Sequence, residues 1–351
     1  KARSVNLFER VAGGAFRAPV SVHDLSSAAF REALPTHVYT RVLEEIALLD
    51  DLGASFDLER VLAGELSPVF FGSAVNNFGV QLLLDAFLDL APPPQPRLAG
   101  TRVVKPEEDR FAGFIFKIQA NLDPKHRDRL AFIRVCSGRF QRDMVVTHTR
   151  SGAKVRLSNA HRLFGRERET VEDAYPGDVV GLIGRPEFAI GDTLAEDANL
   201  SFDAIPAFAP ECFAWLHSTD MAQFKRFRLG LEQLLQEGVI QSFRLPNSVV
   251  SAPFLGAVGA LQFEVLQYRL ESEYGARSRL EMAEWTILRW VHEGDVHNVP
   301  LPFGARVASD PAGRDVILFA DRWSMQAFQD RHRTIRLGEI PPGTRMQAVR
   351  G

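Results

Sequence analysis

Three stretches of the chain differ in the spacing of their hydrophobic residues. In the first, residues 68–72 form a short apolar run typical of a buried strand, and residues 80–90 carry apolar side chains at helical spacing. A turn of small residues, "GSAV" at 72–75, separates them. In open α/β sheets, ligands bind beyond the carboxyl ends of the strands. The turn is therefore a candidate ligand loop, although a turn that merely joins two packed elements has the same pattern.

The second stretch has a different pattern, running from Phe111 to about Leu200 in short alternating segments. Gly, Pro, Asn and Asp separate these segments, which include "GFIFKIQA", "RLAFIRVCSG", "DMVVTHT", "KVRLSNA" and "DVVGLIG". Such a pattern is typical of an all-β domain. Strands this short and this evenly spaced close most economically into a small barrel without exposed edges. We therefore expect a β-barrel here.

In the third stretch, the pattern alternates between strand and helix. Strands are predicted at 213–217, 239–243 and 249–255. One helix is predicted after Thr219, its candidate N-cap, with apolar residues from Phe224 to Leu235 and its end at Gly238, and a second at 261–274, closed by Gly275. An extended run, "RSRLEMAEWTILRWV", follows. The order β-α-β-β-α-β predicts a ferredoxin-like α+β sandwich, with two helices on one face of an antiparallel sheet.

Proline-rich segments separate these stretches. "APPPQPR" at 91–97 and "DAIPAFAP" at 203–210 are stiff connectors, because proline fixes φ and removes a backbone donor. We therefore place domains at residues 1–92, 98–202 and 206–340, a multidomain α/β and β chain.

Composition sets the broad class. The chain has 351 residues, 46% hydrophobic and 24% charged, which is ordinary for a soluble protein. Cys136 and Cys212 lie too far apart for a metal motif, and no apolar run reaches the length of a membrane span. We therefore expect a cytoplasmic protein without metal or membrane contact. The chain begins at Lys1 without Met, which leads us to expect a piece of a longer protein.

Positive charge is concentrated in one part of the chain. The net charge is −3, yet residues 97–156 hold 14 basic and 6 acidic side chains. Such a patch attracts an anionic partner and, on nucleic acid, gains from counterion release. A solvated basic face is the ordinary alternative.

The segment "NLDPKHRDR" at 121–129 places several cations in one turn between two strands. Arginine suits bidentate contact with phosphate oxygens, and lysine supplies a point charge. Cations on edge strands also serve solubility alone, which leaves a second interpretation. The predicted RNA-binding residues are Lys125, His126, Arg127, Arg129, Arg134 and Arg139.

Motifs for catalysis do not occur in the sequence. It contains no G-x-x-x-x-G-K-[ST] phosphate loop, no Asn-Lys-x-Asp, no G-x-S-x-G, no H-E-x-x-H and no C-x-x-C. We therefore predict no catalytic residue and no metal ligand in this chain.

Several segments, read in order, resemble the bacterial class II peptide-chain release factors, which are translational GTPases. They are "SPVFFGSAVNNFGVQLLLDAF", "FAGFIFKIQANLDPKHRDRLAFIRVCSG", "VEDAYPGDVVGLIG", "AIGDTL", "FAPECF" and "VGALQFEVLQYRLESEYG". The resemblance covers nearly the whole chain. It implies the tail of a doubly wound GTPase domain, a translation-factor β-barrel, and a ferredoxin-like α+β domain.

The resemblance also implies a function. Ser73 and Ala74 stand where the family places a guanine-contacting turn, and the full-length protein would bind GTP or GDP with Mg²⁺. It would act as a monomer on the ribosome, its barrel facing small-subunit ribosomal RNA and proteins, and stimulate departure of the codon-reading release factors. This chain alone would be inactive as a GTPase. A freestanding RNA-binding or scaffold protein, and a relative of elongation factor G, are the alternatives.

Overall fold

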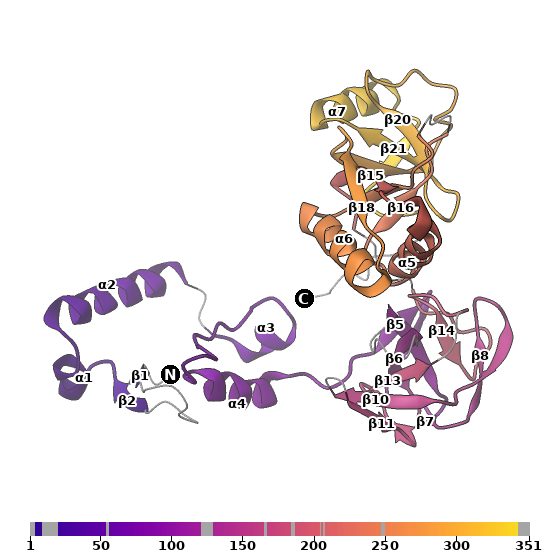
Figure 1. Cartoon of the computed structure of the whole chain (residues 1–351). Helices are drawn as coiled ribbons and strands as arrows, with labels where there is room; N and C mark the ends of the chain where they lie inside the picture. Colours follow the sequence, from indigo (N-terminus) through magenta and orange to yellow (C-terminus); the bar gives the residue numbers. More distant parts are fainter. Residues whose placement is uncertain are drawn as a thin grey trace. The chain divides into compact units, whose positions relative to one another are not determined.

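The computed structural model of the chain describes residues 4–8, 20–53, 56–120, 129–164, 167–183, 187–203, 205, 208–246 and 250–342. These residues belong to two compact units, which meet in sequence between Pro93 and Pro94. Figure 1 labels many of the helices and strands of both units.

The first unit consists, in its described part, of a hairpin and several helices. β1 (Ser4–Phe8) pairs with β2 (Val20–Asp24), and the helices are α1 (Ala28–Glu32), α2 (Thr36–Leu52), α3 (Leu58–Leu62) and α4 (Val80–Leu90). Side chains cap the two short helices: Ser27 accepts from the amide of Phe30, and Asp57 from that of Arg60. The helix predicted at 80–90 is confirmed as α4 with the same bounds.

The buried strand predicted at residues 68–72 is wrong. The segment is extended but is not a strand, and its side chains are exposed: Val69 by 74% and Phe71 by 85%. An extended segment becomes a strand only when a neighbour takes its backbone hydrogen bonds, and no described segment does so here. The helix after it, α4, also buries none of its residues against the described chain.

The β-rich domain contains one eight-stranded antiparallel sheet in the order β11-β10-β13-β6-β5-β14-β8-β9. Its strands are β5 (Ala112–Ala120), β6 (Arg129–Ser137), β8 (Val145–His148), β9 (Ala153–Arg156), β10 (Ala160–Phe164), β11 (Glu167–Thr170), β13 (Val179–Ile183) and β14 (Thr193–Ala195). A smaller pair joins β7 (Phe140–Gln141) to β12 (Asp173–Ala174). The sheet curls around one core, because buried Ile115, Val155, Ala160 and Leu194 from widely separated strands pack in a single cluster.

The ring of strands is not closed among the described residues. β11 and β9 are the two ends of the sheet order and do not pair with each other. The prediction of a closed barrel without edges is therefore too strong. Both end strands carry an exposed charged residue, Glu169 in β11 and Lys154 in β9, and charge on an edge strand protects it from pairing with another chain.

A second apolar cluster covers the outer side of β5. The hairpin of β3 (Arg97–Ala99) and β4 (Arg102–Val104) contributes Val104, and the chain leaving the barrel contributes Leu200 and Phe202. These residues pack on Phe114 of β5. The outer face of β5 is therefore partly core and partly surface.

The ferredoxin-like prediction is confirmed in element order and sheet topology. β15 (Cys212–Ser218), α5 (Phe224–Gln236), β16 (Gln241–Phe243), β17 (Phe254–Ala257), α6 (Ala260–Tyr274) and β18 (Ser278–Met282) form an antiparallel sheet in the order β16-β17-β15-β18. Thr219 is not the N-cap. Asp220 instead caps a short 3₁₀ turn, Met221–Gln223, that leads into α5.

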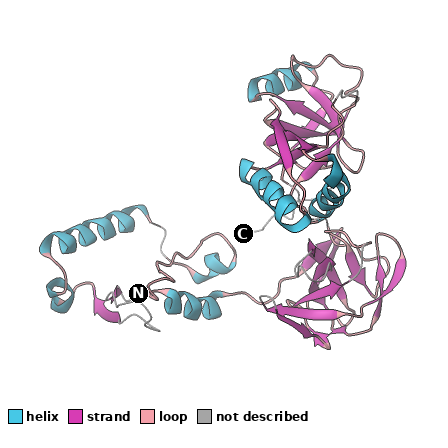
Figure 2. Cartoon of the chain, viewed as in Figure 1, coloured by secondary structure: helices cyan, strands magenta, loops and turns pink. Residues whose placement is uncertain are grey.

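A second four-stranded sheet follows, which the sequence analysis did not predict. β19 (Ile287–Glu293), β20 (Arg306–Ser309), β21 (Asp315–Phe319), α7 (Arg322–Arg331) and β22 (Arg336–Gly338) form a sheet in the order β20-β21-β19-β22. Figure 2 shows the strands of this region between outer helices. Along β15, Ala214 and Leu216 face α5 and α6, whereas Phe213 packs against Leu288 and Val316 of the second sheet. The result is a four-layer stack of helices, sheet, sheet and helix.

Candidate nucleic-acid interface

The turn that contains Ser73 and Ala74 is closed by a pair of backbone hydrogen bonds. The amide of Ser73 donates to the carbonyl of Phe78 at 2.9 Å, and the amide of Phe78 donates back at 3.2 Å. The Ser73 hydroxyl accepts from the Asn76 side chain at 3.0 Å. Asn77 and Gly79 have φ of 51° and 73°, the left-handed values that such a tight turn requires.

Two backbone donors of this turn have no acceptor. The amides of Ala74 and Val75 make no hydrogen bond to any described residue, and both side chains are exposed. A Cβ on Gly79 would lie 2.2 Å from the carbonyl oxygen of Phe71, so only glycine fits where the turn leads into α4. The turn therefore presents free amide donors on a tightly held backbone, as a hydrogen-bonding ligand requires.

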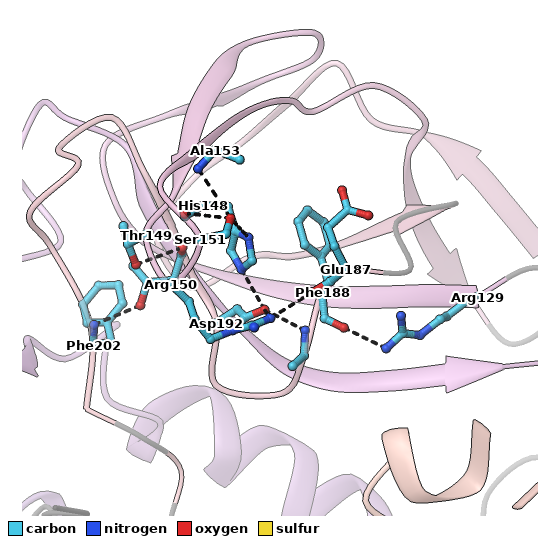
Figure 3. A network of polar contacts seen from close by, with 12 residues as sticks. Arg129, His148, Thr149, Arg150, Ser151, Ala153, Glu187, Phe188, Asp192 and Phe202 are labelled. Carbon is cyan, nitrogen blue, oxygen red and sulfur yellow. Dashed lines mark hydrogen bonds and ion pairs between the residues drawn. The ribbon is translucent and has the colours of Figure 1, made fainter. Parts of the chain in front are cut away.

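The structure describes only the last residue of the predicted basic segment 121–129. Lys125, His126 and Arg127 lie outside the described residues. Arg129, the first residue of β6, is half-buried and donates from Nη2 to the carbonyl of Phe188 at 2.7 Å (Figure 3). Burial lowers the pKa of the Arg129 guanidinium, while Glu187, Asp192 and Glu237 oppose this shift. Arg129 is therefore bound to the protein itself at the base of the loop.

The segment that receives Arg129 is held by a buried carboxylate. Arg150 donates to Asp192 through Nε at 2.5 Å and Nη2 at 2.9 Å, and the amide of Ala189 donates at 2.7 Å. His148 Nε2 lies 2.8 Å from the same carboxylate (Figure 3). This His148 contact is not a well-directed hydrogen bond, since Nε2 has no partner in hydrogen-bonding geometry among the described residues. The network fixes the backbone around Phe188.

The other two predicted arginines lie in different surroundings. Arg139 forms an ion pair with Asp173, and its guanidinium lies 5.6 Å from the ring of Tyr175. Arg134 is exposed on β6 and makes no ion pair or side-chain hydrogen bond with a described residue. Arg134 is therefore available to an external anion, and Arg139 already has one charge partner.

The structure adds two residues that the sequence analysis did not single out. Lys117 stands opposite Phe132 in the β5–β6 register, and its Nζ lies 5.5 Å from the centre of that ring. Phe132 in turn lies 6.4 Å from Phe116, between ring centres. Cations beside aromatic rings on one sheet face are typical of RNA-binding surfaces. The register shift between Ile115 and Lys117 interrupts the alternation of "GFIFKIQA" and turns Lys117 outward, so strict alternation could not predict it.

Neither a metal site nor a membrane-spanning helix is found among the described residues. Within the part of the chain that the structure describes, no group of three or more His, Cys, Asp or Glu residues is arranged to hold a metal ion. No described helix is both long and apolar enough to cross a bilayer.

Comparison with known proteins yields matches along nearly the whole chain. The family described as "Class II release factor RF3, C-terminal domain" matches residues 202–329, and "Elongation factor G domain 2" matches residues 110–197. A protein of Gloeobacter violaceus named peptide chain release factor 3 is 48% identical over 97% of this chain and 64% of its own length. The protein of the same name from Trichodesmium erythraeum is 43% identical over 96% of this chain and 63% of its own length.

A solved structure from Thermus thermophilus shares the fold. It aligns with a TM-score of 0.53 at 19% identity, covering 87% of this chain and 47% of its own. The chain spans slightly under two thirds of the length of the curated relatives. Over the part that it shares with them, the chain is similar to the class II peptide chain release factors.

Proposed function

We propose that the full-length protein is a translation termination factor that uses GTP on the ribosome to stimulate departure of the codon-reading release factors. The observation that carries this proposal is 48% identity, over 97% of the chain, to a protein named peptide chain release factor 3. The work would take place in the bacterial cytoplasm, where ribosomes are.

The nucleotide would be GTP or GDP with Mg²⁺ in the full-length protein. In the chain described here, the residues that would touch the nucleotide are Ser73 and Ala74, at the guanine base. The free amide of Ala74 supports this assignment, because a backbone N–H donates to the O6 of guanine, an acceptor that adenine lacks. The small side chain of Ala74 lets the base approach the turn. The phosphate and Mg²⁺ contacts have no counterpart in this sequence, so GTP hydrolysis is assigned to the full-length protein and not to this chain alone.

The partner of the barrel would be ribosomal RNA of the small subunit. The excess of basic residues in 97–156 supports this, as does exposed, unpaired Arg134. Lys125 and Arg127 would contact phosphates, with His126 beside them. Arg129 would contribute chiefly as an anchor at the start of β6, because one of its N–H donors already bonds the carbonyl of Phe188.

Ribosome pelleting at several salt concentrations tests the RNA contact. Replacing Lys125 and Arg127 by Ala should lower the slope of log affinity against log salt by about 1.4 to 1.8, at roughly 0.7 to 0.9 per phosphate contact. Arg142→Ala is the matched control, because Arg142 is paired with Glu172 at 2.8 Å and should change the slope little. An unchanged slope in the double variant would indicate that these cations serve solubility and do not contact RNA.

A relative of elongation factor G is the second candidate, and the match of residues 110–197 to domain 2 of that factor favours it. The C-terminal match is the discriminating one, since residues 202–329 fit the release-factor family instead. A termination assay in which the full-length protein recycles a codon-reading release factor would separate the two. Translocation activity without recycling would favour the elongation factor.

A further inference from the structure

Arg97 places a guanidinium on the outer face of the barrel without a hydrogen-bond partner. Its Cζ lies 3.7 Å from the centre of the Phe114 ring and 5.7 Å from that of Phe202. The side chain is half-buried and its Nε is fully buried, yet the guanidinium makes no hydrogen bond or ion pair with any described residue. Arginine has five N–H donors, and buried donors are nearly always satisfied. This group therefore lacks an acceptor that its position calls for.

A second guanidinium lies beside the first. Arg134 stands directly opposite Phe114 in the β5–β6 register, on the face against which Arg97 stacks. Burial lowers the pKa of Arg97, and the charge of Arg134 lowers it further, so the two cations repel each other. Arg134 has no carboxylate partner among the described residues. Two like charges thus share one patch, and no described carboxylate forms an ion pair with either of them.

The charges of both Arg97 and Arg134 act on the thiol of Cys136. It lies two residues after Arg134, on the same face of β6. Burial raises the pKa of its thiol to about 11, and Arg97 and Arg134 both oppose that shift. Both guanidinium groups are therefore close enough to Cys136 to act on it.

The nearest carboxylate does not neutralise the pair. Asp203 attracts Arg97 electrostatically, but no ion pair forms between them. One oxygen of Asp203 accepts from the amide of Gly100 at 2.9 Å, and the other is buried without a partner. Asp203 is therefore the internal alternative against which an external anion must be tested.

The surroundings favour an anion that belongs to RNA. Stacking on Phe114 fixes the plane of the Arg97 guanidinium and leaves its edge donors for planar, bidentate contact with phosphate oxygens. Along the same two strands, Lys117 lies beside the ring of Phe132, which is half-buried. Cations that alternate with aromatic rings suit a phosphate backbone with bases stacked beside it.

We propose that Arg97 and Arg134 together form a phosphate-binding site on the outer face of β5 and β6, and that its ligand is a backbone phosphate of RNA. The site rests on the proposed ribosomal function and adds to it a contact surface formed by described residues outside the loop at 121–129. The shared chemistry is a phosphate oxyanion, which free phosphate would also supply.

Single substitutions, each measured by ribosome pelleting at several salt concentrations, test the site. Arg97→Met and Arg134→Met keep most of the side-chain volume, and each should lower the log-log salt slope by about 0.7 to 0.9. Arg97→Lys should restore the slope but not the full affinity, since it keeps the charge and loses the planar fork. Arg102→Met is the matched control, because Arg102 is already paired with Glu108 at 2.7 Å and Asp197 at 3.0 Å. Slopes unchanged in both Met variants would overturn the proposal.

Titration of the 351-residue chain with a short single-stranded RNA and with inorganic phosphate separates the two sources. Binding of the RNA that is lost in Arg97→Met and Arg134→Met supports the site. Binding of inorganic phosphate at these residues, with ribosome affinity unchanged in the variants, would overturn the assignment to RNA.

The variant Asp203→Asn tests the alternative that Arg97 serves Asp203 within the protein and not an external phosphate. If Arg97 serves an external phosphate, removing the neighbouring negative charge should strengthen RNA binding. If Arg97 instead serves Asp203, then Asp203→Asn and Arg97→Met should destabilise the fold equally and leave RNA binding alone, which overturns the proposal. Lys125 and Arg127 are not involved, so a failure of the loop variants and a failure of this site are read separately.

Discussion

The carboxylate of Glu237, just after α5, accepts a hydrogen bond from the backbone amide of Ala120, the last residue of β5, at 2.7 Å. Glu237 also pairs with Arg269 of α6 at 2.6 Å, and Arg269 pairs with Glu273 at 2.5 Å. The Glu237 side chain is only 5% exposed. One buried carboxylate thus joins the barrel to both helices of the ferredoxin-like layer.

Glu237→Ala should lower the free energy of unfolding by about 2 kcal/mol. The change leaves the Ala120 amide without an acceptor and Arg269 with one carboxylate instead of two. Glu237→Gln keeps an acceptor for the amide and should cost less. Urea unfolding measures both, with exposed Glu232 on the same helix as control: Glu232→Ala should stay within about 0.5 kcal/mol of the parent chain. Equal effects of the two alanine variants would contradict the structural role of Glu237.

Asp192 should make the stability of the barrel depend on acid pH. Burial raises the pKa of Asp192, but hydrogen bonds from Arg150 and the Ala189 amide, with the contact to His148, outweigh it, so the pKa lies below its ordinary value. In the unfolded chain the group titrates near pH ~3.9. Its contribution is therefore present above about pH 4 and is lost as pH falls through the lower folded pKa.

Asp192→Asn should remove this pH dependence. At neutral pH the variant should be less stable by about 2 kcal/mol, because Arg150 and His148 lose their charged partner. Its stability should then fall less steeply than that of the parent chain between about pH 5 and pH ~2.5. Denaturant unfolding at stepped pH measures this, with exposed Asp109→Asn as control. Parallel pH curves for Asp192→Asn and the parent chain would show that another group carries the acid response.

The chain alone should not bind guanine nucleotide tightly. A single base-contacting turn cannot replace the phosphate and Mg²⁺ contacts on which nucleotide affinity depends. Calorimetric titration with GDP should show no submicromolar binding to the 351-residue chain. Tight binding that disappears in Gly79→Ala, where a Cβ would clash with Phe71, would reveal a fuller site around this turn.

The thiol of Cys136 should react slowly with alkylating reagents. Its pKa of about 11 leaves roughly one thiolate in a thousand at pH 8, whereas an ordinary cysteine near pKa ~8.5 has a sizeable fraction. Arg97→Met and Arg134→Met should slow the reaction further, because both cations lower this pKa. Mass spectrometry of a Cys212→Ser variant follows the reaction at Cys136 alone. Alkylation at the rate of a free thiol would place Cys136 in a different environment.

The predictions from sequence succeeded where the pattern and the local structure agree. α4 and the ferredoxin-like order followed from helical spacing and from turns such as Gly275, which has the left-handed φ of 62° expected of a helix end. The second sheet was missed because its central strand, "DVILF", is buried on both faces and shows no alternation. The run at 68–72 failed for the opposite reason, since burial depends on a partner strand and not on the run itself.

The site was less predictable than the fold. Charge counting drew attention to Arg134 and Arg139 equally, yet Arg139 pairs with Asp173, which is 34 residues away in the sequence. Arg97 was attributed to a proline-rich connector, because nothing local shows that it stacks on Phe114. Whether a cation is free or paired depends on residues distant in sequence, and spacing rules do not reach them.

The two ends of the barrel segment are fastened to each other. The amide of Gly100 donates to Asp203 at 2.9 Å, and the amide of Asp203 donates to the carbonyl of Leu98 at 3.4 Å. A force that pulls the flanking connectors apart therefore loads these few bonds first and bypasses the eight-stranded sheet. In mechanical terms, the eight-stranded sheet lies outside the path of force between the two ends of the segment, which these hydrogen bonds join. A force between the flanking segments would pass across these bonds, and the strands of the sheet would carry little of it.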